Sequence, residues 1–347
     1  MRAVTFVEPF RVVVDDVPEP NMEAATDVIV QVESSAICGS DLHPYRGHEV
    51  GLDSGTVLGH EFVGLVAEVG DAVTRFREGD RVVSPFSTSC GDCWYCGASL
   101  TARCARGQLF GWIENGEGLQ GGQAEFVRAP LADSTLLAVP AKIGQSAAAL
   151  FAGDILATAL FAVAGGNVSP GDTIAVVGAG PVGQMAVVAA QESPADVIWA
   201  IDPLLGRRTL AESFGAMTAT PEDAPRLLAE ATEGRGADVV IEAVGSSEAT
   251  ALAYAIVRPG GTISAAGVHT EPHFAFSPGA AYDKNLTYTA GRCSARVFAP
   301  QALEIVASGR YDLEAIISHT LPLDEAATGY TMFDARTDDC TKVLLVP

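Results

Sequence analysis

The sequence is poor in positive charge. Its 347 residues include 21 lysines and arginines against 43 aspartates and glutamates, which gives a formal net charge of −22. A protein that binds a phosphate backbone needs clustered Lys and Arg to release counterions, so this balance excludes nucleic acid as a partner. Acidity on this scale favours solubility but carries no information about the fold.

The sequence also lacks the segments that direct a chain into or across a membrane. Met1 to Phe10 has no basic region followed by an apolar stretch, so we expect no signal peptide. The most apolar stretch, Ala147 to Gly166, contains Asp154, and a carboxylate costs roughly 2.5 to 3.5 kcal/mol at a bilayer centre. We therefore expect no membrane span and a cytoplasmic location.

Low-complexity tracts, repeats of fixed period and Pro- or Ser-rich linkers are absent as well. Hydrophobic residues make up 48% of the chain and charged residues 18%, which predicts a folded globular protein. The length fits about two domains.

Two different patterns of expected strands and helices follow one another along the chain. Val28 to Val83 shows short alternating strands punctuated by glycine, which predicts a β-rich domain. After Pro170, apolar strands alternate with helices, which predicts a parallel sheet with helices on both faces. From about Ser294 the pattern is mixed and ends in the β-like Lys342 to Val346, which can pack back on the first domain. The strands expected in the parallel sheet are Thr173 to Val177, Val197 to Ile201, Asp238 to Ala243, Thr262 to Gly267 and Leu286 to Ala290.

Seven cysteines in a chain without a secretion signal predict metal ligands or thiols rather than disulfides. Four of them have the spacing C-x2-C-x2-C-x7-C. Four thiolates can surround one tetrahedral Zn²⁺ at about 2.3 Å each and leave no open position, so such a site is structural. The alternatives are an iron–sulfur cluster, because C-x2-C-x2-C also occurs in ferredoxins, or free cysteines. The four residues are Cys90, Cys93, Cys96 and Cys104.

A second candidate metal site combines Cys38, His60 and Asp154. One thiolate, one imidazole and a third protein ligand, with one exchangeable water, is the ligand set of a catalytic zinc. A carboxylate in so apolar a run as that around Asp154 is costly unless it is paired or bound to a cation. Taken singly, Cys38 fits a small buried residue, His60 a core histidine, and Asp154 the N-cap of a helix beginning at Ile155. Glu61 follows His60 on an expected strand, so its side chain should point to the opposite face, and we expect it to support the ligands or bind only transiently.

A glycine-rich turn predicts a dinucleotide-binding site. Gly178, Gly180 and Gly183 form G-x-G-x-x-G between an expected strand and a helix that opens with Pro181 and Val182. The first glycine permits the tight turn, the second lets a pyrophosphate approach the backbone, and the third lets helix and strand pack closely. The helix N-terminus then receives the phosphate charge.

An acidic residue follows at about the distance this fold requires, some 20 residues further on. The carboxylate of Asp202 can accept hydrogen bonds from the ribose hydroxyls of NAD and would repel a 2′-phosphate, so NAD is favoured over NADP. Arg207 and Arg208 lie nearby, and such a pair can also attract a 2′-phosphate.

With these residues in hand, the chain resembles the zinc-containing medium-chain dehydrogenase/reductase family, which includes alcohol, polyol and formaldehyde dehydrogenases. The resemblance covers essentially the whole length. Its markers, in the family's order, are Cys38-Gly39-Ser40-Asp41, Gly59-His60-Glu61, the four-cysteine lobe and the glycine fingerprint.

The resemblance implies an α/β fold with a GroES-like β-rich catalytic domain and a Rossmann domain with a doubly wound parallel sheet. The implied limits are residues 1–155 for the catalytic domain, with the structural zinc lobe at about 88–106, residues 156–292 for the NAD-binding domain, and residues 293–347 for a return to the catalytic domain. The third zinc ligand in this family is cysteine, aspartate or glutamate, and this chain carries the aspartate version at Asp154.

The implied activity is hydride transfer between an alcohol, or the corresponding aldehyde or ketone, and a nicotinamide cofactor, with two zinc ions per subunit. Ser40 and His43 would relay the alcohol proton; otherwise they are a helix cap and an exposed histidine. Phe86 matches a position in the substrate pocket, or is an ordinary core aromatic. The cofactor contacts implied are Thr158, Gly267 and Val268 at the nicotinamide, Arg207 at the adenosine ribose, Lys342 at the pyrophosphate unless it is a solvated surface cation, and Arg292.

Other interpretations remain open at this point. The chain could be a polyol or formaldehyde-type dehydrogenase, or a protein that binds NAD and zinc without catalysis. A zinc-free quinone or enone reductase of the same superfamily would lack the cysteines and His60 that are present here. The resemblance also implies a homodimer, often within a homotetramer, in which strands near Thr262 to Gly267 and Leu286 to Ala290 pair across the dimer.

Overall fold

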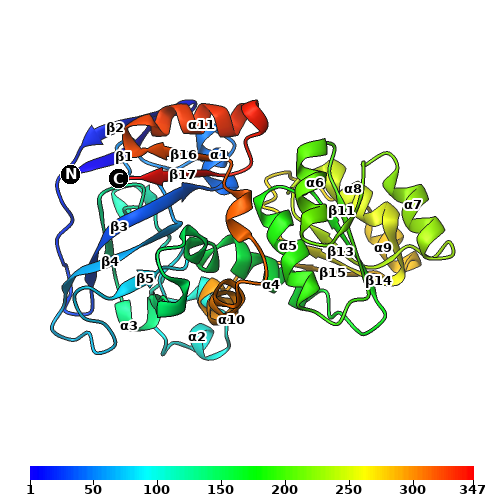
Figure 1. Ribbon diagram of the computed structural model, residues 1–347, viewed down its shortest axis with the longest axis horizontal. Helices are drawn as coiled ribbons and strands as arrows, with labels where there is room; N and C mark the ends of the chain where they lie inside the picture. Colours follow the sequence, from blue (N-terminus) through cyan, green and yellow to red (C-terminus); the bar gives the residue numbers. More distant parts are fainter. The chain divides into compact units, whose positions relative to one another are not determined.

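The chain folds into two compact units in the computed structural model, which describes residues 1–337 and 339–347 in full and only the backbone of residue 338. Unit 1 comprises Met1–Ala157 and Ser294–Pro347, and unit 2 comprises Thr158–Cys293 (Figure 1). The mixed α/β architecture is confirmed. The domain limits stay a prediction, because compactness does not test whether a segment folds independently.

Unit 1 is built around a seven-stranded sheet with the order β16-β17-β3-β4-β5-β9, in which β8 also pairs with β3. The C-terminal strand joins the N-terminal part, since Val343 lies opposite Ile37 in an antiparallel pair. Two hairpins complete the strands of the unit, β1 (Arg2–Glu8) with β2 (Arg11–Asp16) and β6 (Trp112–Glu114) with β7 (Glu117–Leu119). The members of the large sheet are β3 (Val28–Ile37), β4 (Phe62–Val69), β5 (Arg81–Val83), β8 (Phe126–Ala129), β9 (Leu137–Ala138), β16 (His319–Pro322) and β17 (Val343–Val346).

The helices of unit 1 are short apart from the two near the C-terminus. Apolar side chains of the last long helix pack with β1, β2 and β17 in one buried cluster. The 3₁₀ helices are η1 (Gly39–Asp41), η2 (Thr101–Arg103), η3 (Ala141–Ile143), η4 (Ala147–Gly153), η5 (Leu313–Ile316), η6 (Leu323–Glu325) and η7 (Thr337–Asp339). The α-helices are α1 (Leu42–Tyr45), α2 (Trp94–Gly97), α3 (Ala132–Thr135), α10 (Ala295–Ser308) and α11 (Ala326–Ala335).

The most apolar segment forms η4 and α4 (Ile155–Gly165), and the chain passes from one unit to the next within α4. The two helices are bent by 44° at Asp154. Among the described residues, no single helix is long and apolar enough to cross a membrane. The bent pair of η4 and α4 together has the length and composition of a membrane span, but by those two measures only. The cytoplasmic location stays a prediction from the sequence.

Unit 2 contains a six-stranded parallel sheet with the order β12-β11-β10-β13-β14-β15, and Figure 1 shows helices on either side of it. The central strands are buried along their whole length, which explains their continuous apolar runs. The strands are β10 (Thr173–Val177), β11 (Val197–Ile201), β12 (Met217–Ala219), β13 (Ala237–Glu242), β14 (Val257–Ala265) and β15 (Thr287–Ala290). The helices are α5 (Pro181–Gln191), α6 (Leu205–Ser213), α7 (Ala224–Ala231), α8 (Ser247–Ile256) and α9 (Pro278–Asp283).

The five strands predicted for this sheet are present, and two predictions need correction. β12 was missed, because three residues are too few to show a period. The expectation that the strand near Thr262 to Gly267 pairs across a dimer is wrong, because β14 is hydrogen-bonded to β13 on one side and to β15 on the other. Only β15 and β12 are edges of this sheet.

The turn between β10 and α5 requires glycine at two positions. Gly178 has a φ of +90°, a conformation that residues with a Cβ rarely adopt. A Cβ on Gly183 would lie 1.8 Å from the carbonyl oxygen of Gly178. The helix can therefore approach the turn this closely only if residue 183 has no side chain.

Gly183→Ala is expected to lower the free energy of unfolding by about 1–3 kcal/mol, because the added methyl group meets backbone rather than a flexible side chain. A urea titration followed by circular dichroism measures the change. Gly279→Ala in α9 is the matched control, since its Cβ would meet only the Ser277 hydroxyl at 3.7 Å, and it should leave stability unchanged or raise it by about 0.4–1 kcal/mol. Equal stabilities for the two variants would contradict the tight packing of the turn.

Candidate metal and cofactor sites

Among the described residues of unit 1, two clusters of side chains could hold a metal ion. Within each cluster, one potential ligand atom from every residue lies within 4.8 Å of the others. The first cluster is Cys90, Cys93, Cys96 and Cys104, and the second is Cys38, His60, Glu61 and Asp154.

The four-cysteine cluster has the dimensions of a tetrahedral zinc site. Its sulfurs are free thiols rather than disulfides. The Sγ atoms of Cys90 and Cys96 are 3.9 Å apart, as are those of Cys93 and Cys104. Four sulfurs bound to one Zn²⁺ at about 2.3 Å lie about 3.8 Å from one another, so the cluster fits the ion. The backbone N–H of Cys90 also donates to the Cys104 sulfur at 3.2 Å, as expected around a thiolate.

The second cluster is assembled from three loops of unit 1. Cys38 follows β3 and caps η1, His60 and Glu61 precede β4, and Asp154 lies at the bend between η4 and α4. Oδ2 of Asp154 is 3.3 Å from Nε2 of His60 and 3.4 Å from Sγ of Cys38. The three predicted ligands therefore face one point. The side chain of Asp154 is buried and directed at His60, so the alternative that it serves only as a helix cap does not describe it.

The electrostatics of this cluster fit a bound cation. Burial, with the charges of Asp154 and Glu61, raises the pKa of the Cys38 thiol to about 11. Burial also raises the pKa of Glu61, partly opposed by Lys342. The cluster thus contains more acidic side chains than cationic ones. A divalent ion bound there would neutralise the excess negative charge. Thiolate, imidazole and carboxylate are all zinc ligands, so the donor set fits zinc.

The orientation predicted for Glu61 is wrong. Its carboxylate lies inside the cluster and not on the opposite face of a strand. Strand alternation does not apply, because β4 begins only at Phe62. The carboxylate is held by Lys342, whose Nζ donates to Glu61 Oε1 at 2.7 Å, and neither side chain has any exposed surface.

This pairing also corrects the description of Lys342. The alternative of a solvated surface cation is wrong, since the side chain is fully buried. Its ammonium group lies in unit 1 beside Glu61, and the contact with a cofactor pyrophosphate stays a prediction. The long separation of the two residues in the sequence left no local signal for the pair.

Asp41 contacts two residues of this cluster and was not among the site residues predicted from the sequence. Its Oδ1 lies 3.2 Å from Nδ1 of His60, and its Oδ2 accepts the backbone N–H of Cys38 at 2.9 Å. A carboxylate on the far nitrogen of a ligand histidine fixes the ring and its tautomer. The sequence did contain a signal for Asp41, because it is the last residue of the Cys-Gly-Ser-Asp segment that begins with the predicted ligand Cys38.

The other residues predicted around this cluster lie close to it or on the adjoining helix. Ser40 Oγ is 3.1 Å from His60 Nε2 and 3.3 Å from Cys38 Sγ. Phe86 is buried, with its ring centre 6.5 Å from that of His60. His43 is half-buried in α1 rather than exposed, and burial lowers the pKa of its imidazole.

Unit 2 gathers the predicted adenosine-binding residues at the carboxyl ends of β10 and β11. Asp202 Oδ2 accepts the N–H of Ala179 in the glycine turn at 2.9 Å. Arg207 Nη1 lies 3.6 Å from Asp202, and a Cβ on Gly180 would be 3.5 Å from it. Arg208 is engaged elsewhere, because its Nη1 donates to the carbonyl of Asp202 at 2.7 Å and to that of Pro203 at 2.9 Å.

The carboxyl ends of β13 and β14 hold a second acidic residue, Glu242, which sequence reasoning did not single out. It is fully buried, its Oε1 accepts the N–H groups of Val244 and Gly245 at 2.8 Å, and its Oε2 lies 2.9 Å from Nε2 of His269. A Cβ on Gly267 would be 2.8 Å from the same carboxylate. The remaining predicted cofactor residues are Thr158, half-buried in α4, Val268, 46% exposed, and Arg292, exposed after β15.

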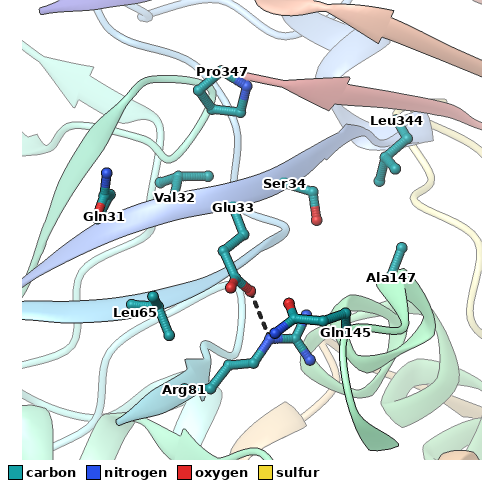
Figure 2. A pocket seen from close by; sticks show the side chains of 10 residues that line it. All are labelled: Gln31, Val32, Glu33, Ser34, Leu65, Arg81, Gln145, Ala147, Leu344 and Pro347. Carbon is teal, nitrogen blue, oxygen red and sulfur yellow. Dashed lines mark hydrogen bonds and ion pairs between the residues drawn. The ribbon is translucent and has the colours of Figure 1, made fainter. Parts of the chain in front are cut away.

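A separate pocket of about 480 Å³ lies along β3, β4 and β5 in unit 1 (Figure 2). The charged groups in this pocket already have hydrogen-bond partners. Nε of Arg81 donates to the carboxylate of Glu33 at 2.6 Å, and its Nη1 donates to the backbone carbonyl of Gly144 at 2.7 Å. None of the residues of the two clusters lines it. The lining residues are Gln31, Val32, Glu33, Ser34, Leu65, Arg81, Gln145, Ala147, Leu344 and Pro347.

Comparisons with known proteins agree with this arrangement. Residues 24–141 match the alcohol dehydrogenase GroES-like domain, and residues 181–308 match the zinc-binding dehydrogenase domain. Zinc-type alcohol dehydrogenase B of Aspergillus flavus is 39% identical over 96% of this chain and 79% of its own length.

Solved structures show the same similarity. An alcohol dehydrogenase from Thermus sp. ATN1 is 42% identical with a TM-score of 0.93, covering 100% of this chain and 99% of that one. A zinc-binding dehydrogenase from Sinorhizobium meliloti 1021, solved bound to NADP, is 27% identical with a TM-score of 0.87 over 100% and 99% of the two chains. The predicted GroES-like and Rossmann architecture is confirmed, as are zinc and a nicotinamide cofactor. The chain belongs to the zinc-dependent medium-chain dehydrogenase/reductase family.

Proposed function

We propose that this oxidoreductase of the alcohol dehydrogenase type transfers hydride between a small alcohol, or the corresponding aldehyde or ketone, and NAD. The observation that carries the proposal is the buried convergence of Cys38, His60 and Asp154, with Asp154 Oδ2 3.3 Å from His60 Nε2 and 3.4 Å from Cys38 Sγ. Three protein ligands leave one position open, which distinguishes a catalytic zinc from the closed four-cysteine site.

Each of the three ligands has a distinct role in holding the ion. Cys38 and Asp154 supply negative charge, and His60 supplies a nitrogen whose ring is held from behind by Asp41. When bound, zinc acts as a Lewis acid toward the oxygen of an alcohol or carbonyl. Lys342 neutralises the Glu61 carboxylate inside the cluster, so Glu61 supports the three ligands or binds the ion only transiently.

The neighbouring polar residues provide a path for a proton out of a buried site. Ser40 has its hydroxyl within 3.1 Å of His60 Nε2, so it is placed to exchange a proton with a substrate hydroxyl bound there. His43 lies three residues after Ser40, in α1, and is half-buried. Burial lowers the pKa of its imidazole, so the ring is available to accept the proton and pass it on. Phe86, packed edge-on against His60, restricts the space for water and substrate.

NAD is the proposed cofactor because Asp202 places a carboxylate where a 2′-phosphate would otherwise lie. Arg208 donates to the backbone carbonyls of Asp202 and Pro203, and among the described residues no hydrogen bond joins it to the Asp202 carboxylate. Arg207 remains beside Asp202 and Gly180 and is placed to contact the adenosine ribose. Further contacts are proposed for Thr158, Gly267, Val268 and Arg292 at the nicotinamide half.

A dimer formed through the edge strand β15 is the proposed assembly, alone or within a tetramer. The unpaired backbone groups of a sheet edge are a template for pairing with a second chain. The segment that precedes this strand exposes Phe274 and Tyr282, with 63% and 85% of their surface accessible. A second copy joined at β15 would cover both the backbone groups and apolar surface.

Metal analysis tests the zinc proposal directly. The purified chain is expected to hold close to two zinc ions, and Asp154→Asn is expected to hold one, because the amide keeps the shape but lacks the charge. Removing a group that only supports a metal ligand costs about 10- to 100-fold in metal affinity or activity. Asp154 is proposed to be a ligand itself, so kcat/KM of Asp154→Asn should fall by at least about 100-fold. Asp16→Asn, at an exposed site, is the control and should retain both ions. Full zinc and full turnover in Asp154→Asn would show that Asp154 is not a ligand.

Cofactor preference tests the role of Asp202. The ratio of kcat/KM for NAD over NADP is expected to favour NAD, and Asp202→Asn should lower that ratio by about tenfold or more. Like charges brought together at a binding surface cost several kcal/mol, and about 1.4 kcal/mol already gives tenfold. Asp196→Asn removes an exposed carboxylate from the same unit and should leave the ratio unchanged. A ratio that is the same in Asp202→Asn and the parent chain would remove the basis for NAD preference.

Light scattering tests the proposed dimer. Thr287→Lys combined with Ala290→Lys puts two exposed charges on β15, and their repulsion across a two-fold axis should reduce the mass toward that of one chain. Met217→Lys on β12, the opposite edge, is the matched control and should leave the mass unchanged. An unaltered mass in the β15 variant would place the interface elsewhere.

A further inference from the structure

We propose that Tyr330 is a positioning residue for His60 and acts through a buried chain formed by Gln123 and Asp41. The inference rests on the proposed function, in which His60 binds the catalytic zinc. It links α11, near the C-terminus, to a ligand in the N-terminal part of the chain.

The four side chains make consecutive contacts inside unit 1. The Tyr330 hydroxyl donates to Gln123 Oε1 at 2.9 Å, Gln123 Nε2 donates to Asp41 Oδ2 at 3.3 Å, and Asp41 Oδ1 lies 3.2 Å from His60 Nδ1. Tyr330 and Gln123 have no exposed surface, and Asp41 and His60 are 6% and 9% exposed. Water therefore does not compete for these contacts.

The direction of every hydrogen bond in the chain is fixed by chemistry. The amide nitrogen of Gln123 must face Asp41 and the carbonyl of Ala36, 3.2 Å away, because both of these groups only accept. Its oxygen then faces Tyr330, which has to donate. Burial, reinforced by the charge of Asp41, raises the pKa of Tyr330 well above its usual value, so the hydroxyl keeps the proton it donates.

This direction sets the form of His60. A carboxylate on Nδ1 holds the proton on that nitrogen, so Nε2, which lies on the side of Asp154, would give its lone pair to a metal ion bound there. Asp41 also accepts the N–H of Cys38 at 2.9 Å. One carboxylate therefore orients two of the three proposed ligands, and Gln123 and Tyr330 fix that carboxylate.

The backbone of Gln123 and the first part of its side chain are held close to the turn that carries His60. Its backbone N–H donates to Leu58 at 2.9 Å, and a Cβ on Gly59 would lie 2.3 Å from its Cγ. The glutamine is thus packed against the turn that carries His60. If the tyrosine hydroxyl is removed, Gln123 Oε1 becomes a buried acceptor without a donor, and the amide can turn away from Asp41 to seek one.

Tyr330→Phe tests the inference, because it removes the hydroxyl and keeps the ring. We expect zinc to leave the catalytic site about tenfold faster in the presence of a chelator, in line with the effect of groups that support a ligand. With Co²⁺ in place of zinc at this site, the visible absorption bands should shift, since they report the geometry of the ligands. Tyr45→Phe is the matched control, because that ring packs 5.4 Å from the Tyr330 ring in the same core, and it should behave like the parent chain.

A second variant distinguishes a chain of contacts from a general loss of packing. Gln123→Leu should accelerate zinc release, and adding Tyr330→Phe to it should have no further effect, since the link is already broken. Equal release rates and spectra for Tyr330→Phe, Tyr45→Phe and the parent chain would overturn the inference, as would additive effects of the two changes. A parent chain that binds metal only at the four cysteines would overturn the proposed function, and the inference with it.

Discussion

Buried negative charge is the constraint on which unit 1 depends. A carboxylate or thiolate removed from water is costly unless it is paired or bound to a cation. The structure balances these groups one by one: Lys342 pairs with Glu61, and Asp41 is bound by N–H groups and by His60. Cys38 and Asp154 lie against each other and near His60, with Oδ2 of Asp154 3.4 Å from Sγ of Cys38 and 3.3 Å from Nε2 of His60. Burial, together with the charges of Asp154 and Glu61, raises the pKa of the Cys38 thiol to about 11, and a metal ion bound here would offset the buried negative charge.

The fold brings these groups together by using the ends of its elements. Cys38 follows β3, His60 precedes β4, and Asp154 sits at a bend where the backbone leaves helical geometry, with φ −140° and ψ −84°. A continuous helix through Asp154 would carry its carboxylate along the helix surface, whereas the break turns it toward His60. The strand β17 then brings Lys342 to the same place by pairing with β3.

The features that could be predicted from the sequence are those that depend on residues close together along the chain. Cysteine spacing, the glycine turn and the strands β10 and β11 are local patterns, and each was recognised because a few residues contain the whole signal. Pairs such as Lys342 with Glu61 and Tyr330 with Gln123 join positions 281 and 207 residues apart and leave no such pattern. Glu61 was misplaced for a related reason, since two-residue alternation holds only inside a strand, and the strand begins one residue later.

Asp202 is a buried acid that holds a loop and, in the proposed function, would also contact the cofactor ribose. Its Oδ2 accepts Ala179 N–H in the glycine turn, and its Oδ1 accepts Leu204 N–H at the start of α6. An ionised carboxylate has about four lone-pair sites, so two remain for the hydroxyls of a ribose. In the function proposed above, the charge that fixes the turn would also favour ribose hydroxyls over a 2′-phosphate. Glu242 braces the loop after β13 in the same way, with two N–H groups on Oε1 and His269 on Oε2, so both loops at this edge of the sheet are held before any cofactor binds.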